Sequence, residues 1–433
     1  MRILLLGSGG RENALAWKLS QSVWTNPLYI APGNPGTARY GNNVNLDISD
    51  FDAIAKFCKS EKIEVIIVGP EEPLVNGLYD YFKSKEDLKE IYFVGPSKEG
   101  AQLEGSKAFA KAFMKRHNIP TAGHREFTAE NYEEGVEYLK QHSLPIVLKA
   151  DGLAAGKGVI ICKNQIEALA EFELMIQTAK FGEASKKVVV EDFLEGIELS
   201  VFVLTDGKNY LLLPEAKDYK RIGVGDTGLM TGGMGAVSPV PFATPGFMHK
   251  IEERIIRPTV EGLYKEGIEY TGFIFFGLIN VKGDPYVIEY NCRMGDPETE
   301  VVIPRMETDL IGLCVAACNK ELHLVKIRTD ERAAATIMAV SKGYPGYFEK
   351  GIEITGLDGK YGKQSLVFHA GTKEQDGKIV SNGGRVFCVT SYGENIEEAV
   401  NTSLDVMSYI DFDGMYYRND IGYEFVSSSK KYR

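Results

Sequence analysis

The sequence predicts an α/β and α+β multidomain protein whose N-terminal part is a doubly wound parallel sheet. Strand-like and helix-like segments alternate through the first hundred residues, which is typical of that architecture. After residue 106 the strand-like segments come in neighbouring pairs beside helices, which indicates an α+β region. The chain has 433 residues, and at ~150 residues per domain this length corresponds to about three domains.

The N-terminal prediction rests on short apolar runs that end near a glycine or proline turn. In residues 2–6, every residue after Arg2 is apolar, which fits a strand of a parallel sheet covered on both faces. The further runs are residues 27–31, 64–68 and 91–94. Helices are predicted at residues 13–20 and 50–62, the second from its amphipathic spacing. We place the end of this domain at residue 103.

The middle region, residues 104–325, is predicted to combine helices with paired strands. Helices are expected at residues 107–117 and 130–142. Three strand pairs are expected: 146–149 with 158–162, 188–193 with 198–204 across the turn at 194–197, and 272–281 with 285–291. Residues 326–433 form a third, smaller α+β domain, with strands at 333–340, 364–370 and 385–390 and a helix at 395–409.

Composition and charge narrow the function classes. The net charge of −11 opposes a broad nucleic-acid surface, because binding phosphate backbones requires a basic face. The first apolar run is too short for a signal peptide, and no run reaches the ~18 apolar residues of a membrane span. The six cysteines form no C-x-x-C pair. We therefore expect a reduced, cytoplasmic protein with small-molecule partners, no nucleic acid and no membrane; a monomer is compatible with the sequence.

The first motif is Gly-Ser-Gly-Gly-Arg-Glu at residues 7–12, between a predicted strand and a predicted helix. Glycines at this place let backbone N–H groups approach a phosphate at a helix N-terminus. The motif matches two glycines of the dinucleotide fingerprint, but Glu12 stands where the third belongs. It therefore indicates either a phosphate site or a merely tight turn, and it supports a nicotinamide cofactor only weakly.

The second motif, Lys-Ala-Asp-Gly-Leu-Ala-Ala-Gly-Lys-Gly at residues 149–158, resembles a P-loop but fails its spacing. Three residues separate Gly152 from Gly156, and a glycine follows Lys157 in place of Ser or Thr. A glycine hairpin between two strands suits a lid that closes over phosphates, with Lys149 and Lys157 neutralising their charge. The alternative is an ordinary glycine-rich hairpin with solvated lysines.

The third motif is the strand at residues 286–291 with its continuation to residue 298. Period-two geometry places Glu289, Asn291 and Arg293 on one face if the strand persists. A carboxylate and an amide oxygen two residues apart can hold Mg²⁺ that also binds ATP phosphates. An arginine beside them can bind a carboxylate or phosphate bidentately. The alternative is the polar outer face of an edge strand.

A fourth segment, residues 217–235, interleaves charged residues with many glycines. Such a composition makes a poor core element and suits a substrate loop, because glycine permits close backbone approach. An ordered surface loop without a binding role is the alternative.

These motifs occur in an order that resembles the ATP-grasp superfamily and, within it, the phosphoribosylamine–glycine ligase family. The resemblance covers nearly the whole chain. It is carried by the segments at residues 7–12, 33–37 (Gly-Asn-Pro-Gly-Thr), 68–74, 149–159, 190–200, 231–235 (Thr-Gly-Gly-Met-Gly), 291–299 and 368–372 (Phe-His-Ala-Gly-Thr). The resemblance implies a central ATP-grasp domain with a mobile lid subdomain at about residues 121–190.

The resemblance also implies the reaction: ATP-dependent joining of glycine to 5-phosphoribosylamine through glycyl phosphate, in purine synthesis. It implies Mg²⁺ or Mn²⁺ as cofactor, held by Glu289 and Asn291, with ATP as co-substrate. The residues implied to bind ATP are Lys107, Lys149, Lys157, Glu191, Phe193, Leu194 and Glu198. Those implied at the reacting centre are Arg293, Lys149 and Asp218. Those implied to line the phosphoribosylamine pocket are Gly9, Gly10, Arg11, Glu71, Pro96 and Ser97.

Three positions depart from the family's pattern. Asn13 stands in place of an expected histidine, Leu229-Met230 in place of Pro-Asn, and Met294 in place of phenylalanine. Three rival functions remain open: an ATP-grasp ligase for another acid or amine, a non-catalytic nucleotide-binding regulator, and a nicotinamide-dependent oxidoreductase that rests only on residues 7–12. Biotin carboxylase relatives fit less well, because the segments at 231–235 and 368–372 do not suit them.

Overall fold

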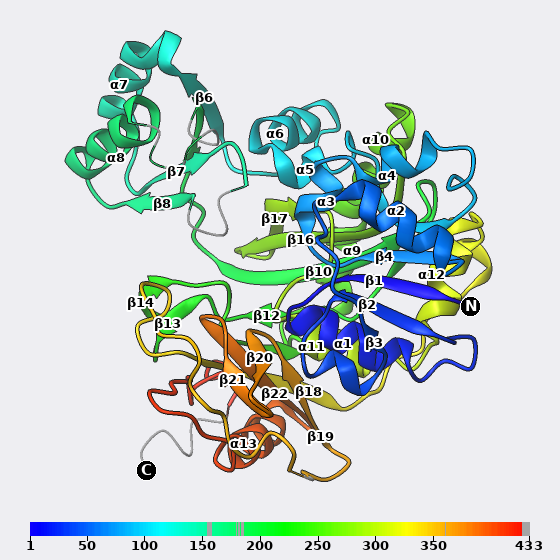
Figure 1. Cartoon of the computed structure of the whole chain (residues 1–433). Helices are drawn as coiled ribbons and strands as arrows, with labels where there is room; N and C mark the ends of the chain where they lie inside the picture. Colours follow the sequence, from blue (N-terminus) through cyan, green and yellow to red (C-terminus); the bar gives the residue numbers. More distant parts are fainter. Residues whose placement is uncertain (154–157, 179, 181, 183–185, 360, 427–433) are drawn as a thin grey trace.

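The computed structural model describes residues 1–153, 158–178, 180, 182, 186–359 and 361–426. It confirms the predicted architecture of an N-terminal doubly wound sheet, a mixed central part and a small C-terminal α+β part (Figure 1). The largest sheet runs through the first two parts in the order β11-β10-β16-β5-β4-β1-β2-β3, with β17 paired to β16. The N-terminal and central parts therefore share one continuous sheet.

The N-terminal half of this sheet is parallel. Its strands are β1 (Ile3–Gly7), β2 (Leu28–Pro32), β3 (Asn42–Asn43), β4 (Val65–Val68) and β5 (Tyr92–Pro96). Its helices are α1 (Gly10–Leu19), α2 (Phe51–Ser60), α3 (Glu71–Val75) and α4 (Leu78–Lys83). The chain builds outward from β1 to β2 and β3, then returns to place β4 on the other side of β1. The strand order therefore reverses between β1 and β4, where doubly wound sheets bind ligands at the carboxyl ends of their strands.

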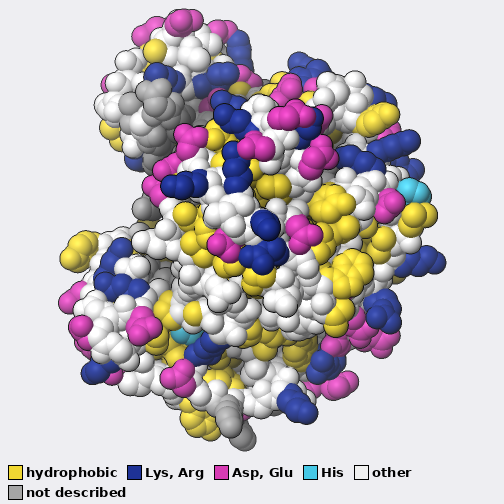
Figure 2. All heavy atoms as spheres, turned by 45° about the vertical axis from the view of Figure 1, so that its right-hand side comes forward, with side chains coloured by type: hydrophobic (Ala, Val, Ile, Leu, Met, Phe, Trp, Pro, Cys, Tyr) yellow, Lys and Arg dark blue, Asp and Glu magenta, His cyan; other side chains and the backbone are white. Residues whose placement is uncertain are grey.

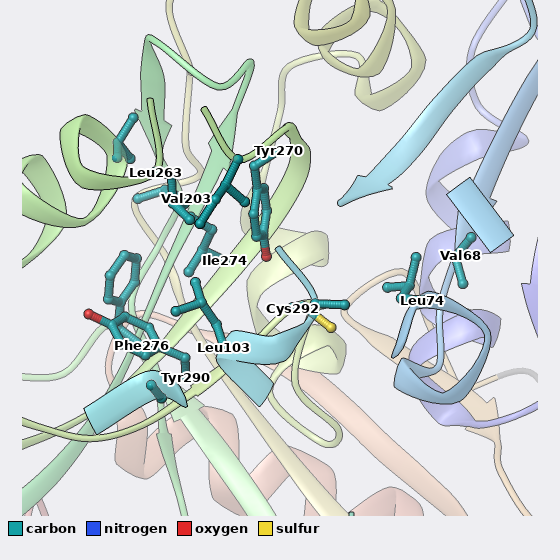
Figure 3. Close-up of a cluster of buried hydrophobic side chains, with 14 of the residues drawn as sticks. Val68, Leu74, Leu103, Val203, Leu263, Tyr270, Ile274, Phe276, Tyr290 and Cys292 are labelled. Carbon is teal, nitrogen blue, oxygen red and sulfur yellow. The ribbon is translucent and has the colours of Figure 1, made fainter. Parts of the chain in front are cut away.

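The central half is antiparallel and joins the N-terminal half where Tyr270 on β16 pairs with Pro96 on β5. Its strands are β10 (Ile197–Thr205), β11 (Tyr210–Leu212), β16 (Tyr270–Val281) and β17 (Asp284–Asn291). Its helices are α5 (Gln102–Gly105), α6 (Lys107–Arg116), α9 (Pro245–Ile251) and α10 (Arg257–Lys265), the last two linked by a π-helical turn, Glu252–Ile256. One hydrophobic core extends across the joint, from Val68 and Leu74 to Val203 and Phe276 (Figure 3).

The predicted hairpin of β16 and β17 is confirmed, with a tight turn at Lys282-Gly283. Both turn residues have positive φ, 52° and 91°, which glycine adopts freely and which favours the right-handed twist of the flanking strands. A bulge interrupts the ladder between Gly277 and Leu278.

A four-stranded subdomain, residues 124–192, stands apart from this body. Its strands are β6 (His124–Thr128), β7 (Ile146–Ala150), β8 (Val159–Cys162) and β9 (Lys187–Asp192), and its helices are α7 (Tyr132–Gln141) and α8 (Gln165–Gln177). It has a core of its own, in which Phe127 and Phe172 are fully buried. Figure 2 shows it as a separate lobe, parted from the lower half of the molecule by a notch.

One predicted strand pair is wrong. Residues 188–193 and 198–204 do form strands β9 and β10, but they do not pair with each other. β9 pairs with β6 and β7 inside the four-stranded subdomain, and β10 pairs with β11 and β16 in the large sheet. Both runs are apolar and nearly adjacent in sequence, so their local pattern suits a hairpin. The partner of each strand is decided by distant segments that bury its faces more completely.

The C-terminal part is built on a five-stranded sheet in the order β12-β15-β18-β22-β19. Its strands are β12 (Lys217–Asp218), β15 (Gly235–Ser238), β18 (Ala333–Val340), β19 (Ser365–His369) and β22 (Arg385–Gly393), with α13 (Ile396–Met407) packed on it. Further elements are α11 (Thr299–Arg305), α12 (Leu310–Cys318), β20 (Thr372–Gln375) and β21 (Lys378–Ser381). Among the helices in the described ranges, none is long and apolar enough to cross a membrane.

The segment at residues 217–235 was predicted to be a loop, and this prediction is wrong in part. Residues at its two ends form β12 and β15, which join the C-terminal sheet, and between them lies a hairpin of β13 (Arg221–Gly223) and β14 (Thr227–Met230). Lys217, Asp218 and Tyr219 are buried. The sequence misleads here because these strands are short, and because β15, which β12 pairs with, is held by β18, about a hundred residues later.

Candidate active site

The candidate site begins at the carboxyl ends of β1 and β4, where the strand order reverses. Gly9 and Arg11 follow β1, and Glu71 follows β4 as the first residue of α3. Arg11 is almost completely buried. Its Nη1 donates a hydrogen bond to the carbonyl oxygen of Met294 at 3.2 Å. The structure thus brings three residues predicted to bind phosphoribosylamine to one edge of the sheet.

Glu12 occupies the N-terminus of α1. Its Oε2 accepts a hydrogen bond from the backbone N–H of Gly9 at 2.6 Å, and its Oε1 pairs with Arg11 Nε at 2.6 Å. The side chain lies against Gly69, where a Cβ would come within 2.0 Å of Oε1. A buried carboxylate therefore stabilises the positive end of this helix. The same place would hold the pyrophosphate in a dinucleotide-binding fold, so the arrangement weighs against a nicotinamide cofactor.

Arg293 lies between two carboxylates just beyond β17. Its Nη2 is 2.7 Å from Glu104 Oε1 and its Nε is 3.3 Å from Glu71 Oε2. Burial would raise the pKa of Glu71, but Arg293 and Arg11 outweigh burial and hold the pKa below its ordinary value. Arg293 is thus a fixed cation whose charge is already balanced, and a substrate anion would have to displace one of these carboxylates to bind it.

Asp296 connects this edge to the C-terminal part. Its Oδ2 accepts a hydrogen bond from the backbone N–H of Arg11 at 3.3 Å, and its Oδ1 lies 2.8 Å from Arg385 Nη2. Arg385, on β22, also donates through Nη1 to the carbonyl oxygens of Gly232 and Asp296, both at 2.7 Å. All three parts of the chain therefore meet within one network of charges.

Gly10 faces Glu300, the second residue of α11. A Cβ at Gly10 would come within 2.3 Å of Glu300 Oε1, so only glycine fits this approach. Glu300 is fully buried, and neither carboxyl oxygen has a hydrogen-bond partner among the described residues. Burial, reinforced by Asp296, raises the pKa of Glu300 well above its ordinary value. The glycine turn therefore rests on a buried acid whose charged form is disfavoured.

A second cluster joins the four-stranded subdomain to the body. Glu191 Oε2, on β9, lies 3.0 Å from Lys149 Nζ on β7 and 3.2 Å from Lys111 Nζ on α6. Lys149 Nζ also donates to the carbonyl oxygen of Ile288 on β17 at 3.0 Å. All three charged side chains are buried. Burial would raise the pKa of Glu191, but the two lysines outweigh it and lower the pKa.

Lys107 lies at the start of α6 on the same side. Its Nζ donates to the carbonyl oxygen of Gly152 at 3.1 Å. Burial lowers the pKa of Lys107, while Glu289 opposes that shift. Asp151 fixes this corner, because its Oδ1 accepts from the Ser106 hydroxyl at 3.0 Å and from the backbone N–H of Ala108 at 2.7 Å. The glycine loop after β7 is thus tied to the helix that carries Lys107.

A third cluster gathers acids around Lys220. Its Nζ lies 2.8 Å from Glu198 Oε2. Burial would lower the pKa of Lys220, but Asp218, Glu198 and Glu289 together raise it well above its ordinary value. Burial and then Asp218 raise the pKa of Glu298 to about 7. The cluster therefore concentrates negative charge beside the predicted metal ligands.

Glu289 and Asn291 fit a magnesium site by their chemistry. Both offer oxygen ligands from one face of β17, and the Nδ2 of the buried Asn291 has no hydrogen-bond partner in the part of the chain that the structure describes. Within the described part of the chain, no group of three or more His, Cys, Asp or Glu side chains is arranged to hold a metal by itself. A site with one carboxylate and one amide suits an ion that completes its shell with phosphate oxygens and water.

Several predicted residues lie outside these three clusters. Phe193 is exposed and Leu194 half-buried in the link between β9 and β10. Pro96 pairs with Tyr270, and Ser97 bonds to Glu269 and Gly100, without a bond to Arg11 or Glu71. Lys157 lies outside the described residues.

The chain matches three models of one family along most of its length. They are described as the N domain, the ATP-grasp (A) domain and the C domain of phosphoribosylglycinamide synthetase, and they match residues 1–104, 105–299 and 334–424. The chain belongs to the phosphoribosylglycinamide synthetase family.

Full-length relatives agree with this assignment. The chain is 46% identical over 434 residues to the phosphoribosylamine–glycine ligase of Vibrio parahaemolyticus, covering 100% of both chains. It is 48% identical to that of Haemophilus influenzae, covering 98% of this chain and 99% of the relative. The solved structure of the Thermotoga maritima phosphoribosylamine–glycine ligase superposes with a TM-score of 0.84 at 36% identity, covering 97% of this chain and 100% of the other.

The biotin carboxylase domain of Hydrogenobacter thermophilus 2-oxoglutarate carboxylase, solved with MgADP, is similar in fold. Its TM-score is 0.72 at 19% identity, and the alignment covers 96% of this chain and 92% of that domain. At this identity the likeness shows the ATP-grasp fold alone. The family matches, not this likeness, distinguish the chain from the biotin carboxylases considered above.

The three departures from the family's pattern lie in different places. Asn13 is fully buried and its Oδ1 accepts from the backbone N–H of His369 at 2.7 Å, so it faces the C-terminal part. Leu229 and Met230 are exposed on β14. Met294 is buried in the core beneath Arg11.

Sequence reasoning did not single out several charged residues that the structure places in these clusters. Lys111 follows Lys107 by four residues and so shares its helix face, a signal that could have identified it. Arg385 has no local signal, because its role depends on β22 lying beside residues 150 positions earlier. The other missed residues are Glu104, Lys220, Asp296, Glu298 and Glu300.

Proposed function

We propose that this chain joins glycine to 5-phosphoribosylamine, converting ATP to ADP and phosphate and producing glycinamide ribonucleotide for purine synthesis. The observation that supports this proposal most strongly is that the N, ATP-grasp and C domains of one family occur in order along the chain. Between the charge clusters, Glu289 interacts with both Lys107 and Lys220. ATP-dependent ligation suits such a site, because three groups must be positioned and several negative charges neutralised.

The chemistry requires two steps. A carboxylate is a poor electrophile, so a glycine carboxylate oxygen first attacks the γ-phosphorus of ATP and ADP leaves. The amine of phosphoribosylamine then attacks the acyl carbon of glycyl phosphate; the C–O bond to phosphate breaks, and the nitrogen loses a proton. Glycyl phosphate would hydrolyse in open water, so a closing lid is part of the proposal.

For ATP, we assign the cluster around Glu191. Lys107 and Lys149 would neutralise the phosphates, with Lys157 on the closing loop. Glu191 has a buried Oε1 that finds no hydrogen-bond partner among the described residues, which supports its assignment to the adenine slot together with Phe193 and Leu194. Glu198 would bind the ribose hydroxyl groups, in exchange for its present bond to Lys220.

For the metal, Glu289 and Asn291 would hold Mg²⁺ or Mn²⁺. The ion supplies charge neutralisation to the phosphates when it is bound. The acids of the Lys220 cluster, Asp218 and Glu298, lie in the same negative region, and Lys220 offsets part of their charge.

For the other two substrates, we assign the edge at β1 and β4. Gly9, Gly10, Arg11 and Glu71, with Pro96 and Ser97, would line the phosphoribosylamine pocket. Arg293 would recognise an anion near the reacting carboxylate, and Asp218 the ammonium of glycine. Because Arg293 is paired with Glu71 and Glu104, its assignment requires an exchange of partners on binding.

We propose the domain bounds 1–103, 104–325 and 326–433, with a mobile lid at about residues 121–190. The separate core of the four-stranded subdomain supports movement as a unit. A cytoplasmic location and a monomeric state stay predictions.

The decisive experiment is ADP release by the purified chain with ATP, Mg²⁺ and glycine, with and without phosphoribosylamine generated in the same tube. We expect ADP release that requires both glycine and the amine, with glycinamide ribonucleotide identified by mass. Turnover with another acid or amine would keep the fold and replace the substrates. ATP binding without turnover of any pair would favour a non-catalytic role.

A further inference from the structure

Two family segments have no part in the assignments above: Gly-Asn-Pro-Gly-Thr at residues 33–37 and Phe-His-Ala-Gly-Thr at 368–372. They lie far apart in sequence but meet in the structure through Asn34. We propose that Asn34 is a positioning residue that ties the Ser8–Gly9 turn to the C-terminal part and so sets the substrate edge against Arg385. The proposal rests on the proposed function and deepens it.

The first step is the turn that holds Asn34 itself. Its Oδ1 accepts hydrogen bonds from the backbone N–H groups of Gly36 at 2.8 Å and Thr37 at 3.0 Å. Its own backbone N–H donates to Thr37 Oγ1 at 2.8 Å. The side chain is 5% exposed. These bonds leave the amide group with one orientation, in which Nδ2 points away from its own turn.

The second step is what Nδ2 reaches. It donates to the carbonyl oxygen of Ser8 at 2.8 Å and to that of His369 at 3.0 Å, with the Gly9 carbonyl oxygen at 3.5 Å. One amide nitrogen therefore joins the glycine turn of the N-terminal part to the end of β19. A side-chain carboxylate could not do this, because it offers no donor.

The third step continues from His369 to Arg385. After His369, the backbone N–H of Ala370 donates to Val386 and that of Gly371 donates to the carbonyl oxygen of Arg385 at 3.0 Å. Arg385 then reaches Asp296, which accepts from the backbone N–H of Arg11. The link through Asn34 is thus one side of a closed loop that runs through both ends of the substrate edge.

Asn13 supplies a parallel bond in the same link. Its Oδ1 accepts from the backbone N–H of His369 at 2.7 Å. Gly36 is required for this packing, because a Cβ there would come within 2.1 Å of Asn13 Oδ1. The interface therefore depends on a few side-chain amides, and one substitution can break its connection without emptying a core position.

The test compares the wild-type enzyme with Asn34→Asp, which keeps the acceptor of the 33–37 turn and removes the donor. The control is Asn395→Ala, which removes the cap of α13 and weakens the C-terminal part without touching the link. The measurements are kcat, the KM of each substrate, the Kd of glycinamide ribonucleotide by calorimetry, and amide hydrogen exchange.

In Asn34→Asp we expect the KM of phosphoribosylamine and the Kd of glycinamide ribonucleotide to rise by about tenfold or more, since two carbonyl oxygens lose their donor. The KM of ATP and of glycine should stay at the wild-type values. Amide exchange should accelerate together in residues 8–11 and 369–372. Asn395→Ala should lower the unfolding temperature without this selective loss.

Equal changes in all three KM values, or no change in the phosphoribosylamine KM, would overturn the proposal. If Asn34→Asp does not fold, Asn13→Ala removes the parallel bond with the 33–37 turn intact, and it must give the same selectivity at a smaller size. If the wild-type enzyme makes no glycinamide ribonucleotide, the proposed function fails separately. The exchange measurement then still decides whether Asn34 links the two parts.

Discussion

At the scale of single residues, Glu289 carries the sharpest test of the metal assignment. It is half-buried on β17 and is the carboxylate of the predicted ligand pair. We expect Glu289→Ala to lower ADP release by at least about 100-fold, since even groups that only support metal ligands commonly matter 10–100-fold. The fold should be retained, because no core packing is removed. The matched control is Glu253→Ala on an exposed helical turn, which should leave activity unchanged. Normal activity in Glu289→Ala would contradict the assignment of Glu289 as a metal ligand.

His369 gives a prediction about pH. It is fully buried, and its pKa is lowered to about 3, by burial and by nearby Arg39. Above pH 7 it is neutral in both folded and unfolded chains. Below pH 6.5 the unfolded chain binds a proton that the folded chain refuses until about pH 3. The free energy of unfolding therefore decreases as the pH is lowered through this window. At pH 5 the protonation of His369 in the unfolded chain has lowered it by about 2 kcal/mol.

The measurement is urea unfolding of wild type and His369→Gln at pH 7.5 and pH 5.0. The variant should lose about 2 kcal/mol less than the wild type between the two values. All other titrating groups are shared by the two proteins, so their contributions cancel. An equal loss in both would mean that His369 takes up its proton while folded.

Residue types in the sequence predict the chemistry of the site better than they predict which residues pair with one another there. Glu289 and Asn291 were identified from the spacing of oxygen donors on one strand, and the structure places them on one face of β17. The pairing of Arg293 with Glu71 and Glu104 could not be predicted, because it joins residues about 190 and 220 positions apart. The positions of these residues in the sequence do not indicate that they are neighbours in the folded chain.

At the scale of elements, the turn from β1 into α1 depends on Gly69, which follows the neighbouring strand β4. A Cβ at Gly69 would come within 2.0 Å of Glu12 Oε1. We expect Gly69→Ala to displace the Glu12 carboxylate from the helix N-terminus and to destabilise the protein by about 1–3 kcal/mol. Because Glu12 also pairs with Arg11, the KM of phosphoribosylamine should rise as well.

The control is Gly246→Ala in α9, where an added Cβ meets nothing within 4 Å. That substitution should be neutral or stabilise by roughly 0.5–1 kcal/mol, because alanine favours a helix more than glycine does. Thermal unfolding and substrate kinetics measure both variants. Equal stability of the two would show that Glu12 moves aside without cost.

Elements with strong local signals were predictable, and those defined by distant partners were not. The hairpin of β16 and β17 was predicted from two apolar runs and the turn between them. β9 and β10 share the same local pattern but pair elsewhere, since burial in separate cores outweighs their closeness in sequence. The two-residue strand β12 lacks enough residues to show any periodicity, and only its pairing with β15 defines it.

At the scale of the whole molecule, the parts are joined unequally. The N-terminal and central parts share one sheet and one core, and β15 of the central segment pairs with β18 of the C-terminal part. The four-stranded subdomain instead has its own core. Three parts were predictable from length and element order, whereas this interlocking was not, because it is made by contacts between distant strands.

This difference predicts which part can be removed. The ends of the four-stranded subdomain adjoin, since the backbone N–H of Asp192 donates to the carbonyl oxygen of Gly123 at 2.9 Å. Two glycines can therefore join the ends after residues 124–191 are deleted, at the loss of the bonds that Lys149, Asp151 and Glu191 make to the body. We expect this variant to unfold cooperatively and to bind glycinamide ribonucleotide, but to release no ADP, because Lys149 and Glu191 are gone.

A chain ending at residue 325 is the opposite case. It lacks β18 and β22, so β12 and β15 lose the sheet that they edge, and Asp296 loses Arg385. We expect this chain to aggregate or to unfold without a cooperative transition, because unpaired strand edges and uncovered core invite association. Circular dichroism during heating and size-exclusion chromatography measure both variants. The opposite result would be that deleting residues 124–191 unfolds the body while the chain ending at residue 325 stays folded. It would mean that the body depends on the four-stranded subdomain more than on the C-terminal part, against what the structure indicates.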